Sequence, residues 1–441
     1  MLKLICSSLI LEDRVAFISC CRRLWACLGV TNSSRLWGVI EAELVRGKDA
    51  DISSYYSVSL GHWLARHKAA VGRLSVQGYL DGANPAGVLA ALEGGALAAL
   101  ELRRMDAVGA NPAAALAPLA HLTGLTELQL LDCDVWRLPP QLSALTALKM
   151  TALRLQCCGL RRLPQQLSAL AASLQTLCVA DNHGNFGGWV IGSMVCPLNS
   201  LSALTSLDMA FCRLPCIPPQ LTAMGSLQQL QLLGNDMTSA QAQPWEPLRR
   251  LSRLTYLDLG DCHLACLPQQ LSCLTALAEL HLSFNPGLGR FLGGHPTGAE
   301  ASSWQPLLSL SASLTSLQLR GCKLAALPAG FSSLSALVSL DLSRNHGLGE
   351  AGDSAFEPLS GLVSVRVLKL NMMELKCIPP QLKLLPALEE LQVWGNKSLG
   401  KQGPALGRQL MELPALKRLD FGYGIDIATR GVQVLGLMSG T

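Results

Sequence analysis

One pattern of leucines recurs along most of the chain and limits its fold more than any other feature. The pattern is L-x-x-L-x-L-x-x-(Cys or Asn)-x-L, and a clear copy runs through Leu254, Leu257, Leu259, Cys262 and Leu264. Self-similarity at a period of about 20–30 residues is the signature of a repeat protein. Each repeat buries its apolar face only against its neighbours, so a chain of 441 residues needs no single large core.

Fourteen copies of the pattern can be placed between residue 71 and the C-terminus. Their first apolar positions are Val71, Leu97, Leu125, Met150, Leu174, Leu204, Leu227, Leu254, Leu277, Leu314, Leu337, Val365, Leu388 and Leu416. The first and last copies are atypical, as expected of the caps of a repeat array. The alternating apolar residues predict a short strand in each copy, and stacked copies build a parallel sheet. The sequence therefore predicts an α/β solenoid, a leucine-rich-repeat horseshoe with a parallel β-sheet on its concave face, preceded by a small α-helical N-terminal segment.

Two kinds of copy alternate, and they differ at the position after the strand. One kind carries cysteine there, at Cys133, Cys158, Cys212, Cys262 and Cys322. The other carries asparagine, at Asn182, Asn235, Asn285, Asn345 and Asn396. We expect the thiols to point inward and to donate weakly to loop carbonyls. We expect each asparagine amide to bond the backbone of the next coil, forming a ladder along the stack.

Helix-start signals follow the strands of both kinds of copy. In the cysteine copies Leu-Pro or Ile-Pro precedes a helical stretch, as at Leu267-Pro268 before residues 269–274. Proline fixes φ near the helical value, so we expect it at the first helical position. Leu271 and Leu274, three residues apart, should then face the core.

Composition and cysteine use argue for an intracellular protein without membrane spans. Apolar residues make up 49% of the chain and the mean hydropathy is +0.31, yet no stretch of 18 apolar residues occurs. The net charge of +4 includes no block of like charges, so neither nucleic acid nor a membrane surface is an expected partner. No signal-peptide cleavage site follows the first apolar run. Reduced thiols at inward positions favour a cytoplasmic location, with nuclear, cytoskeletal or axonemal association as further options.

No catalytic or metal-binding motif stands out. The chain has no phosphate-binding loop, no nucleophile elbow and no H-E-x-x-H sequence. Cys212 and Cys216 have a spacing that metal ligands also use, but Leu214 between them points inward and no histidine pair follows. We therefore expect a monomeric protein that is not an enzyme and that uses no cofactor or metal.

Residues between the strand leucines should point to solvent on the concave face and offer a surface for a protein partner. The residues expected to contact that partner are Asp258, His281, Phe284, Arg320, Asp341, Arg344, Lys369, Met372, Trp394, Asp420 and Tyr423. Aromatic and arginine side chains carry most of the energy in protein interfaces, which favours this C-terminal half. The alternative is that the aromatic residues only cover the turn after each strand. The first interpretation predicts that Arg344→Ala and Trp394→Ala weaken partner capture, whereas Gln129→Ala does not.

The residues before the repeats break the pattern. We divide the chain into a helical segment at 1–45, a linker helix or N-terminal cap at 46–70, and the repeats at 71–441. The first segment has apolar residues at helical spacing, followed by Cys21-Arg22-Arg23 and Leu36-Trp37. In these features it resembles the second half of an F-box, as found in algal and plant F-box leucine-rich-repeat proteins. Leu24 stands where that family has tryptophan.

The resemblance implies that the segment binds a Skp-type adaptor, and through it a cullin. The residues that would form this contact are Leu2, Ile5, Leu9, Val15, Arg22, Trp25 and Trp37. On this interpretation the chain is the substrate-recognition adaptor of an SCF-type ubiquitin ligase. The alternative is a scaffold with no ligase link, similar to Ras-group-related plant repeats or to repeat proteins of algal axonemes. In that case residues 1–70 only cap the first repeat.

Overall fold

The structure of the chain is a computed structural model, and it describes most of the repeat region. The described residues are 39–44, 64–66, 68–69, 71–78, 89–104, 116–133, 135, 150–160, 163–182, 196–237, 245–292, 299–402, 404–413, 415–421 and 425–426. The chain divides into two compact units. The first comprises Met1–Leu160 with Ala172–Leu174, and the second comprises Arg161–Ala171 with Gln175–Thr441.

The first unit contains five strands that pair in parallel in chain order. They are β1 (Val39–Leu44), β2 (Arg73–Gly78), β3 (Ala99–Arg103), β4 (Glu127–Leu131) and β5 (Ala152–Gln156). A 3₁₀ helix, η1 (Ala117–His121), lies between β3 and β4 in the chain. Strand β1 falls at the end of the segment 1–45 for which the sequence predicted helices, so the helical prediction is wrong for residues 39–44.

The second unit contains ten further parallel strands and ends with one antiparallel strand. The parallel strands are β6 (Thr176–Cys178), β7 (Ser206–Asp208), β8 (Gln229–Gln231), β9 (Tyr256–Asp258), β10 (Glu279–His281), β11 (Ser316–Gln318), β12 (Ser339–Asp341), β13 (Val367–Lys369), β14 (Glu390–Gln392) and β15 (Arg418–Asp420). Strand β16 (Ile425–Asp426) pairs antiparallel with β15. Each parallel strand places one leucine beside the equivalent leucine of its neighbours, as Leu257, Leu280 and Leu317 do.

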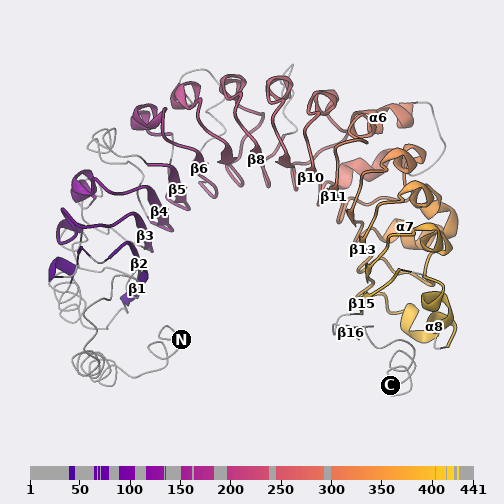
Figure 1. Cartoon of the computed structure of the whole chain (residues 1–441). Helices are drawn as coiled ribbons and strands as arrows, with labels where there is room; N and C mark the ends of the chain where they lie inside the picture. The colour runs from indigo at the N-terminus through magenta and orange to yellow at the C-terminus, as the bar shows by residue number, and fades with distance from the viewer. Residues whose placement is uncertain are drawn as a thin grey trace, which may run out of the picture. The chain divides into compact units, whose positions relative to one another are not determined.

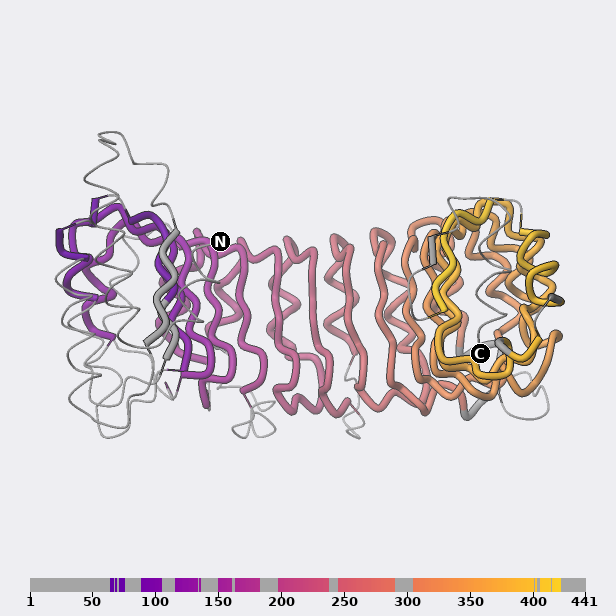
Figure 2. The backbone as a smooth tube through the Cα atoms, turned by 90° about the horizontal axis from the view of Figure 1, so that it is seen from below, coloured from indigo at the N-terminus to yellow at the C-terminus, as the bar shows by residue number. Residues whose placement is uncertain are grey.

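Short helices return the chain from one strand of the second unit to the next. The 3₁₀ helices are η3 (Gln165–Leu170), η5 (Cys196–Ser200), η6 (Pro219–Ala223), η7 (Glu246–Arg250), η8 (Gln269–Cys273), η9 (Pro286–Leu292), η10 (Ala329–Ser333), η11 (Asp353–Gly361), η12 (Pro380–Leu384) and η13 (Leu399–Gln402). The α-helices are α6 (Ala299–Leu308), α7 (His346–Ala351) and α8 (Pro404–Met411). Within this unit the strands line the inner side of an arc and the helices its outer side (Figure 1). The coils stack side by side in regular succession (Figure 2).

The leucines of the repeat pattern form the core between strands and helices. Leu254, Leu257 and Leu259 of one copy are all 0% exposed, as are Leu271 and Leu274 of the helical stretch that follows. All fourteen predicted copies therefore correspond to strands β2 to β15, and the fold is a leucine-rich-repeat solenoid. The burial of Leu271 and Leu274 confirms the predicted helix face.

The prolines of the Leu-Pro and Ile-Pro pairs stand one position earlier than expected. Pro268 is the N-cap of η8 with φ −64° and ψ 133°, and Pro328 is the N-cap of η10 with φ −59° and ψ 137°. Their ψ values are extended rather than helical. Proline therefore ends the extended segment and leaves the first helical position to the next residue, which is compatible with its fixed φ.

The cysteine position behaves as the sequence predicted. Cys212, Cys262 and Cys322 are 0% exposed, and each thiol donates to a carbonyl of the preceding coil. The Sγ–O distance is 3.2 Å in all three, for example from Cys262 to Leu232 O. Burial is the main cause that raises the pKa of the Cys262 thiol to about 12, so the thiol stays protonated at neutral pH.

The asparagine ladder runs in the opposite direction to the prediction, toward the preceding coil instead of the next one. The Asn285 amide donates to Leu259 O and Leu282 O at 2.8 Å each. Its Oδ1 accepts from the backbone N–H groups of Cys262 at 3.0 Å and Leu264 at 2.9 Å. The direction follows from geometry, because the unpaired groups are the N–H groups of the turn that precedes the asparagine copy. Asn235 and Asn396 repeat the arrangement.

Candidate functional site

The inner face of the second unit presents three positions from each coil. The first position lies between the two strand leucines, the second lies two residues later, and the third is the next residue. In the coil of β11 they are Gln318, Arg320 and Gly321. The first positions of β9 to β15 stand side by side in register, which places Asp258, His281, Gln318, Asp341, Lys369, Gln392 and Asp420 in one row.

Three aspartates at the first position close the turns of their own coils. Asp208, Asp258 and Asp341 each accept the backbone N–H two residues later through Oδ1, at 3.0, 2.8 and 2.9 Å. Such an Asx turn uses the carboxylate locally. Asp258 is also only 9% exposed. Two of the predicted partner-contacting residues, Asp258 and Asp341, therefore have a structural task that the sequence analysis did not assign to them.

A half-buried cluster of titratable groups lies where β9 meets β10. The Tyr256 hydroxyl lies 3.1 Å from Nδ1 of His281, and the two rings meet edge to face with centroids 4.9 Å apart. The same Nδ1 lies 3.8 Å from Oδ2 of Asp258. Burial and then the Asp258 charge raise the pKa of Tyr256 to about 12, so its hydroxyl stays protonated. Within the described residues, no group of three or more His, Cys, Asp or Glu side chains is placed to hold a metal ion.

The third position adopts a left-handed backbone in every coil from β3 to β14. Glycine occupies it at Gly234, Gly321 and Gly395, with φ of 71°, 69° and 76°. Larger residues occupy it elsewhere, including Phe211, Phe284, Arg344 and Met372, with φ between 52° and 60°.

Three of the large side chains lie across the glycine of the following coil. A Cβ built on Gly234 would overlap the Phe211 ring, one on Gly321 would meet the Phe284 ring at 3.0 Å, and one on Gly395 would meet Met372 Cγ at 2.8 Å. This packing supports the view that Phe211, Phe284 and Met372 cover turns. Phe211 and Phe284 nevertheless remain 37% and 42% exposed, so both rings still face solvent.

Trp394 and three basic residues complete the inner face in its C-terminal half. Trp394 is 44% exposed, and its backbone N–H donates to the Asn371 side chain at 2.8 Å. Arg320 and Lys369 are partly buried and Arg344 is exposed. Arg320 lies over the Phe284 ring, with its Cζ 5.9 Å from the ring centroid. The structure thus brings most of the predicted partner-contacting residues onto one face.

Several predicted residues lie outside the described part of the chain. They are Tyr423, which was predicted to contact the protein partner, and the residues predicted to contact an adaptor, Leu2, Ile5, Leu9, Val15, Arg22, Trp25 and Trp37. Ser283 and Ser343 were not among the predicted residues, yet their hydroxyls accept the backbone N–H groups of Arg320 at 3.3 Å and Asn371 at 3.2 Å. Their place in the same column as Arg320 is the signal that could have identified them.

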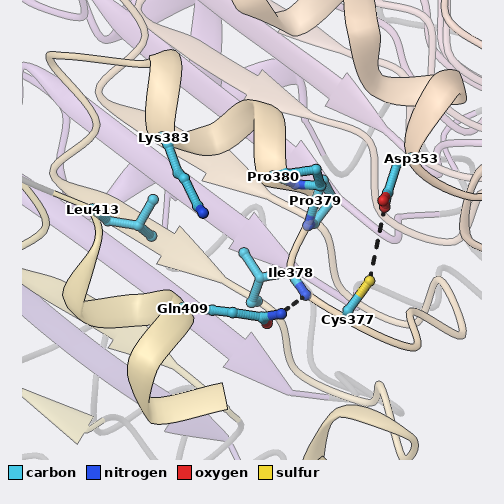
Figure 3. Close-up of a pocket in the computed structure, with 8 residues that line it drawn as sticks. All are labelled: Asp353, Cys377, Ile378, Pro379, Pro380, Lys383, Gln409 and Leu413. Atoms are coloured by element: carbon cyan, nitrogen blue, oxygen red, sulfur yellow. Dashed lines mark hydrogen bonds between the residues drawn. The ribbon is translucent and has the colours of Figure 1, made fainter. Parts of the chain in front are cut away.

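A small cavity of about 120 Å³ lies away from the inner face, among η11, η12 and α8 (Figure 3). Its lining residues are Asp353, Cys377, Ile378, Pro379, Pro380, Lys383, Gln409 and Leu413. Polar groups in the lining are already engaged, because Gln409 Oε1 accepts the Ile378 N–H at 3.3 Å and Lys383 pairs with Glu412. Burial is the main cause that raises the pKa of Cys377, with Asp353 as the second cause.

Comparisons with known proteins find a similar fold in several solved structures. An internalin of Listeria monocytogenes is 19% identical, with 68% of this chain and 75% of that chain covered and a TM-score of 0.47. A leucine-rich-repeat protein of Leptospira interrogans is 19% identical, with 82% and 98% covered and a TM-score of 0.48.

A third similar structure is the leucine-rich-repeat ectodomain of the Arabidopsis thaliana receptor kinase GASSHO1/SCHENGEN3 in complex with CASPARIAN STRIP INTEGRITY FACTOR 2. It is 21% identical, with 79% of this chain covered and a TM-score of 0.45, and the match spans 40% of that chain. No protein-family model and no curated protein matches the sequence. Among the described residues, no helix has the length and apolar character needed to cross a membrane.

Proposed function

We propose that the chain is a protein-interaction module and that the inner face of its second unit binds the partner. The observation that carries this proposal is the set of side chains left open on that face. Phe284 and Trp394 are 42% and 44% exposed, although aromatic residues are costly to leave in water. Exposed aromatic and arginine residues grouped on one surface are typical of the centre of a protein interface.

The direct test compares substitutions on the two sides of the solenoid. Trp394→Ala and Arg344→Ala should each weaken partner binding, because each removes an open side chain of the inner face. Glu357→Ala, on the outer helix η11, is the matched control and should leave binding unchanged. Equal binding by the Trp394→Ala/Arg344→Ala double variant and the unaltered chain would contradict the proposal. Circular dichroism would establish that the variants fold.

For the role of the module, we propose a substrate-recognition adaptor of an SCF-type ubiquitin ligase. Support comes from the F-box resemblance at Cys21-Arg22-Arg23 and Leu36-Trp37, which precede the repeat array in the chain. A purified Skp-type adaptor should then co-purify with the chain. Trp25→Ala should abolish that binding, whereas Trp394→Ala should retain it. Failure of the unaltered chain to bind the adaptor would contradict the ligase role and leave the interaction module intact.

A scaffold with no ligase link is the second candidate. It is favoured by strand β1, which pairs with β2 in parallel over six residue pairs, from Val39 with Arg73 to Leu44 with Gly78. The end of the N-terminal segment thus continues the sheet, as a cap of the array would. A chain that binds a protein partner through the inner face but no Skp-type adaptor would support this candidate.

A further inference from the structure

Three basic side chains stand on neighbouring coils of the inner face. Arg320 follows β11, Arg344 follows β12, and Lys369 ends β13. Among the residues that the structure describes, none of the three forms an ion pair. Arg320 has, in addition, a buried Nε with no hydrogen-bond acceptor. An arginine N–H that is shielded from water and lacks an acceptor is destabilising, so the observation requires a reason.

Basic residues at the N-terminal ends of β13 and β15 behave differently. Arg418 pairs with Glu390 at 3.1 Å, and both Arg366 and Lys417 pair with Glu389, at 3.6 and 3.1 Å. Within the described part of the chain, these basic residues have acidic partners, whereas Arg320, Arg344 and Lys369 have none. We call these three residues the basic cluster.

The acidic residue nearest to the basic cluster along the row forms no ion pair with it among the described residues. Asp341 stands beside Lys369 in the strand register, but its Oδ1 accepts the Ser343 N–H, and it forms no ion pair within the described part of the chain. Phe284 meanwhile lies 5.9 Å from the Arg320 Cζ and fixes the guanidinium over its ring. Arg320 is thus held over the Phe284 ring, and its Nε has no acceptor among the described residues.

From this we infer that the basic cluster binds an acidic segment of the protein partner, one that carries Asp or Glu side chains in an extended conformation. Arginine offers a planar set of donors that matches a carboxylate, and such charge-assisted hydrogen bonds are about twice as strong as neutral ones. This inference rests on the proposed function, because it names the chemistry of the partner that the inner face would bind.

The spacing of the cluster suits an extended chain. Neighbouring strands lie about 4.8 Å apart, so β11 and β13 are about 10 Å apart across the sheet. An extended segment advances about 3.4 Å per residue, so about three residues span this distance. Two carboxylates on alternate residues, about 7 Å apart, would then reach two of the three cations, with Trp394 and Phe284 beside them for an apolar residue of the partner.

The test is selection from a random twelve-residue peptide library displayed on phage, with the full chain as target. Selected peptides are then synthesised with fluorescein, and their affinity is measured by fluorescence anisotropy. We expect the selected peptides to be enriched in Asp and Glu. We also expect the Arg320→Gln/Arg344→Gln double variant to bind them about tenfold more weakly or worse, since two charge-assisted contacts are lost. The matched control is Arg250→Gln on the outer helix η7, which should bind normally.

The outcomes separate this inference from the proposed function. The inference of an acidic partner is overturned if the selected peptides are not enriched in Asp and Glu. It is also overturned if they bind the double variant as tightly as the unaltered chain. If such peptides still lose affinity on Trp394→Ala, the inner face remains the binding surface and only its partner chemistry is wrong. If no inner-face substitution changes their affinity, or if no peptide is selected, both proposals fail. Tighter binding of a twelve-nucleotide thymidine oligomer than of any acidic peptide would also overturn the inference, in favour of a nucleic acid.

Discussion

Replacing the buried Asn285 with alanine is the sharpest test of the forces that hold the solenoid together. The side chain is 0% exposed, so no water replaces the hydrogen bonds that it makes. Asn285→Ala removes the acceptor of the Cys262 and Leu264 N–H groups and the donor to Leu259 O and Leu282 O. Leu282 O keeps one partner, the Cys322 thiol at 3.2 Å. Three backbone groups are then buried without partners.

The structure sets the expected size of the effect. A buried group that loses its partner costs about 1–3 kcal/mol, so three such groups give a loss of at least about 3 kcal/mol in the free energy of unfolding. The matched control is Asn371→Ala. Asn371 also makes two side-chain bonds, to Gln392 at 3.3 Å and from the Trp394 N–H at 2.8 Å, but it is only partly buried. Water can replace its bonds, so we expect a loss of about 1 kcal/mol or less.

Urea unfolding followed by circular dichroism measures both changes, and hydrogen exchange locates them. In the Asn285→Ala variant the amides of Cys262 and Leu264 should exchange faster, whereas the coils of β13 to β15 should change little, because repeats support mainly their neighbours. A loss below about 1 kcal/mol, or a loss equal to that of Asn371→Ala, would refute the reasoning that the asparagine ladder holds adjacent coils together.

Four further predictions rest on the same structure. Leu280→Ala, in the middle of the second unit, should cost about 2–5 kcal/mol by lost burial and cavity formation, and uniformly raised hydrogen exchange along the array would contradict a nearest-neighbour solenoid. At pH 8 an alkylating reagent should modify the exposed Cys266 and spare Cys262, whose pKa burial raises from 9.0 to about 12. As the pH rises, the Cys262 thiol ionises in the unfolded chain before it ionises in the folded chain. The contribution of Cys262 to the free energy of unfolding is therefore intact below pH 9.0 and is lost as the pH rises toward about 12. Urea unfolding at several pH values would measure this loss. Arg344→Gly should raise the free energy of unfolding by up to about 1 kcal/mol, because a left-handed backbone at φ 60° is strained for arginine and not for glycine, and a less stable variant would contradict this.

The repeat pattern allowed most of the fold to be predicted from the sequence. Spacing alone placed the strand leucines, because a leucine such as Leu257 can be buried only if its neighbours at fixed offsets are buried too. It also identified the inward cysteines, since Cys262 recurs at a position flanked by core leucines. The direction of the asparagine bonds was wrong, because the pattern does not show which neighbouring coil has unpaired N–H groups.

The candidate site was predicted less completely than the fold. The sequence indicated which side chains face solvent, but it does not show which of them form hydrogen bonds or ion pairs with other groups of the same chain. Asp258 was predicted to contact a protein partner, but its carboxylate closes a turn of its own coil. Phe284 was predicted to contact the partner too, and its ring also covers Gly321. The unpaired state of Arg320 depends on three-dimensional distances to every acidic group around it. Strand β1 was missed because Val39–Leu44 lies outside the leucine pattern.

Photo-crosslinking tests the central claim, that the inner face of the second unit binds the partner, most directly. A photoreactive side chain is placed either at Gln318, in the middle of the inner face, or at Glu357, on the outer helix η11, and the full chain is irradiated with a selected peptide. Both positions are partly or fully exposed, so neither substitution disturbs the core. If the inner face binds the partner, a crosslinked product forms from Gln318 and none forms from Glu357. Crosslinking from Glu357 that equals or exceeds crosslinking from Gln318 would contradict it.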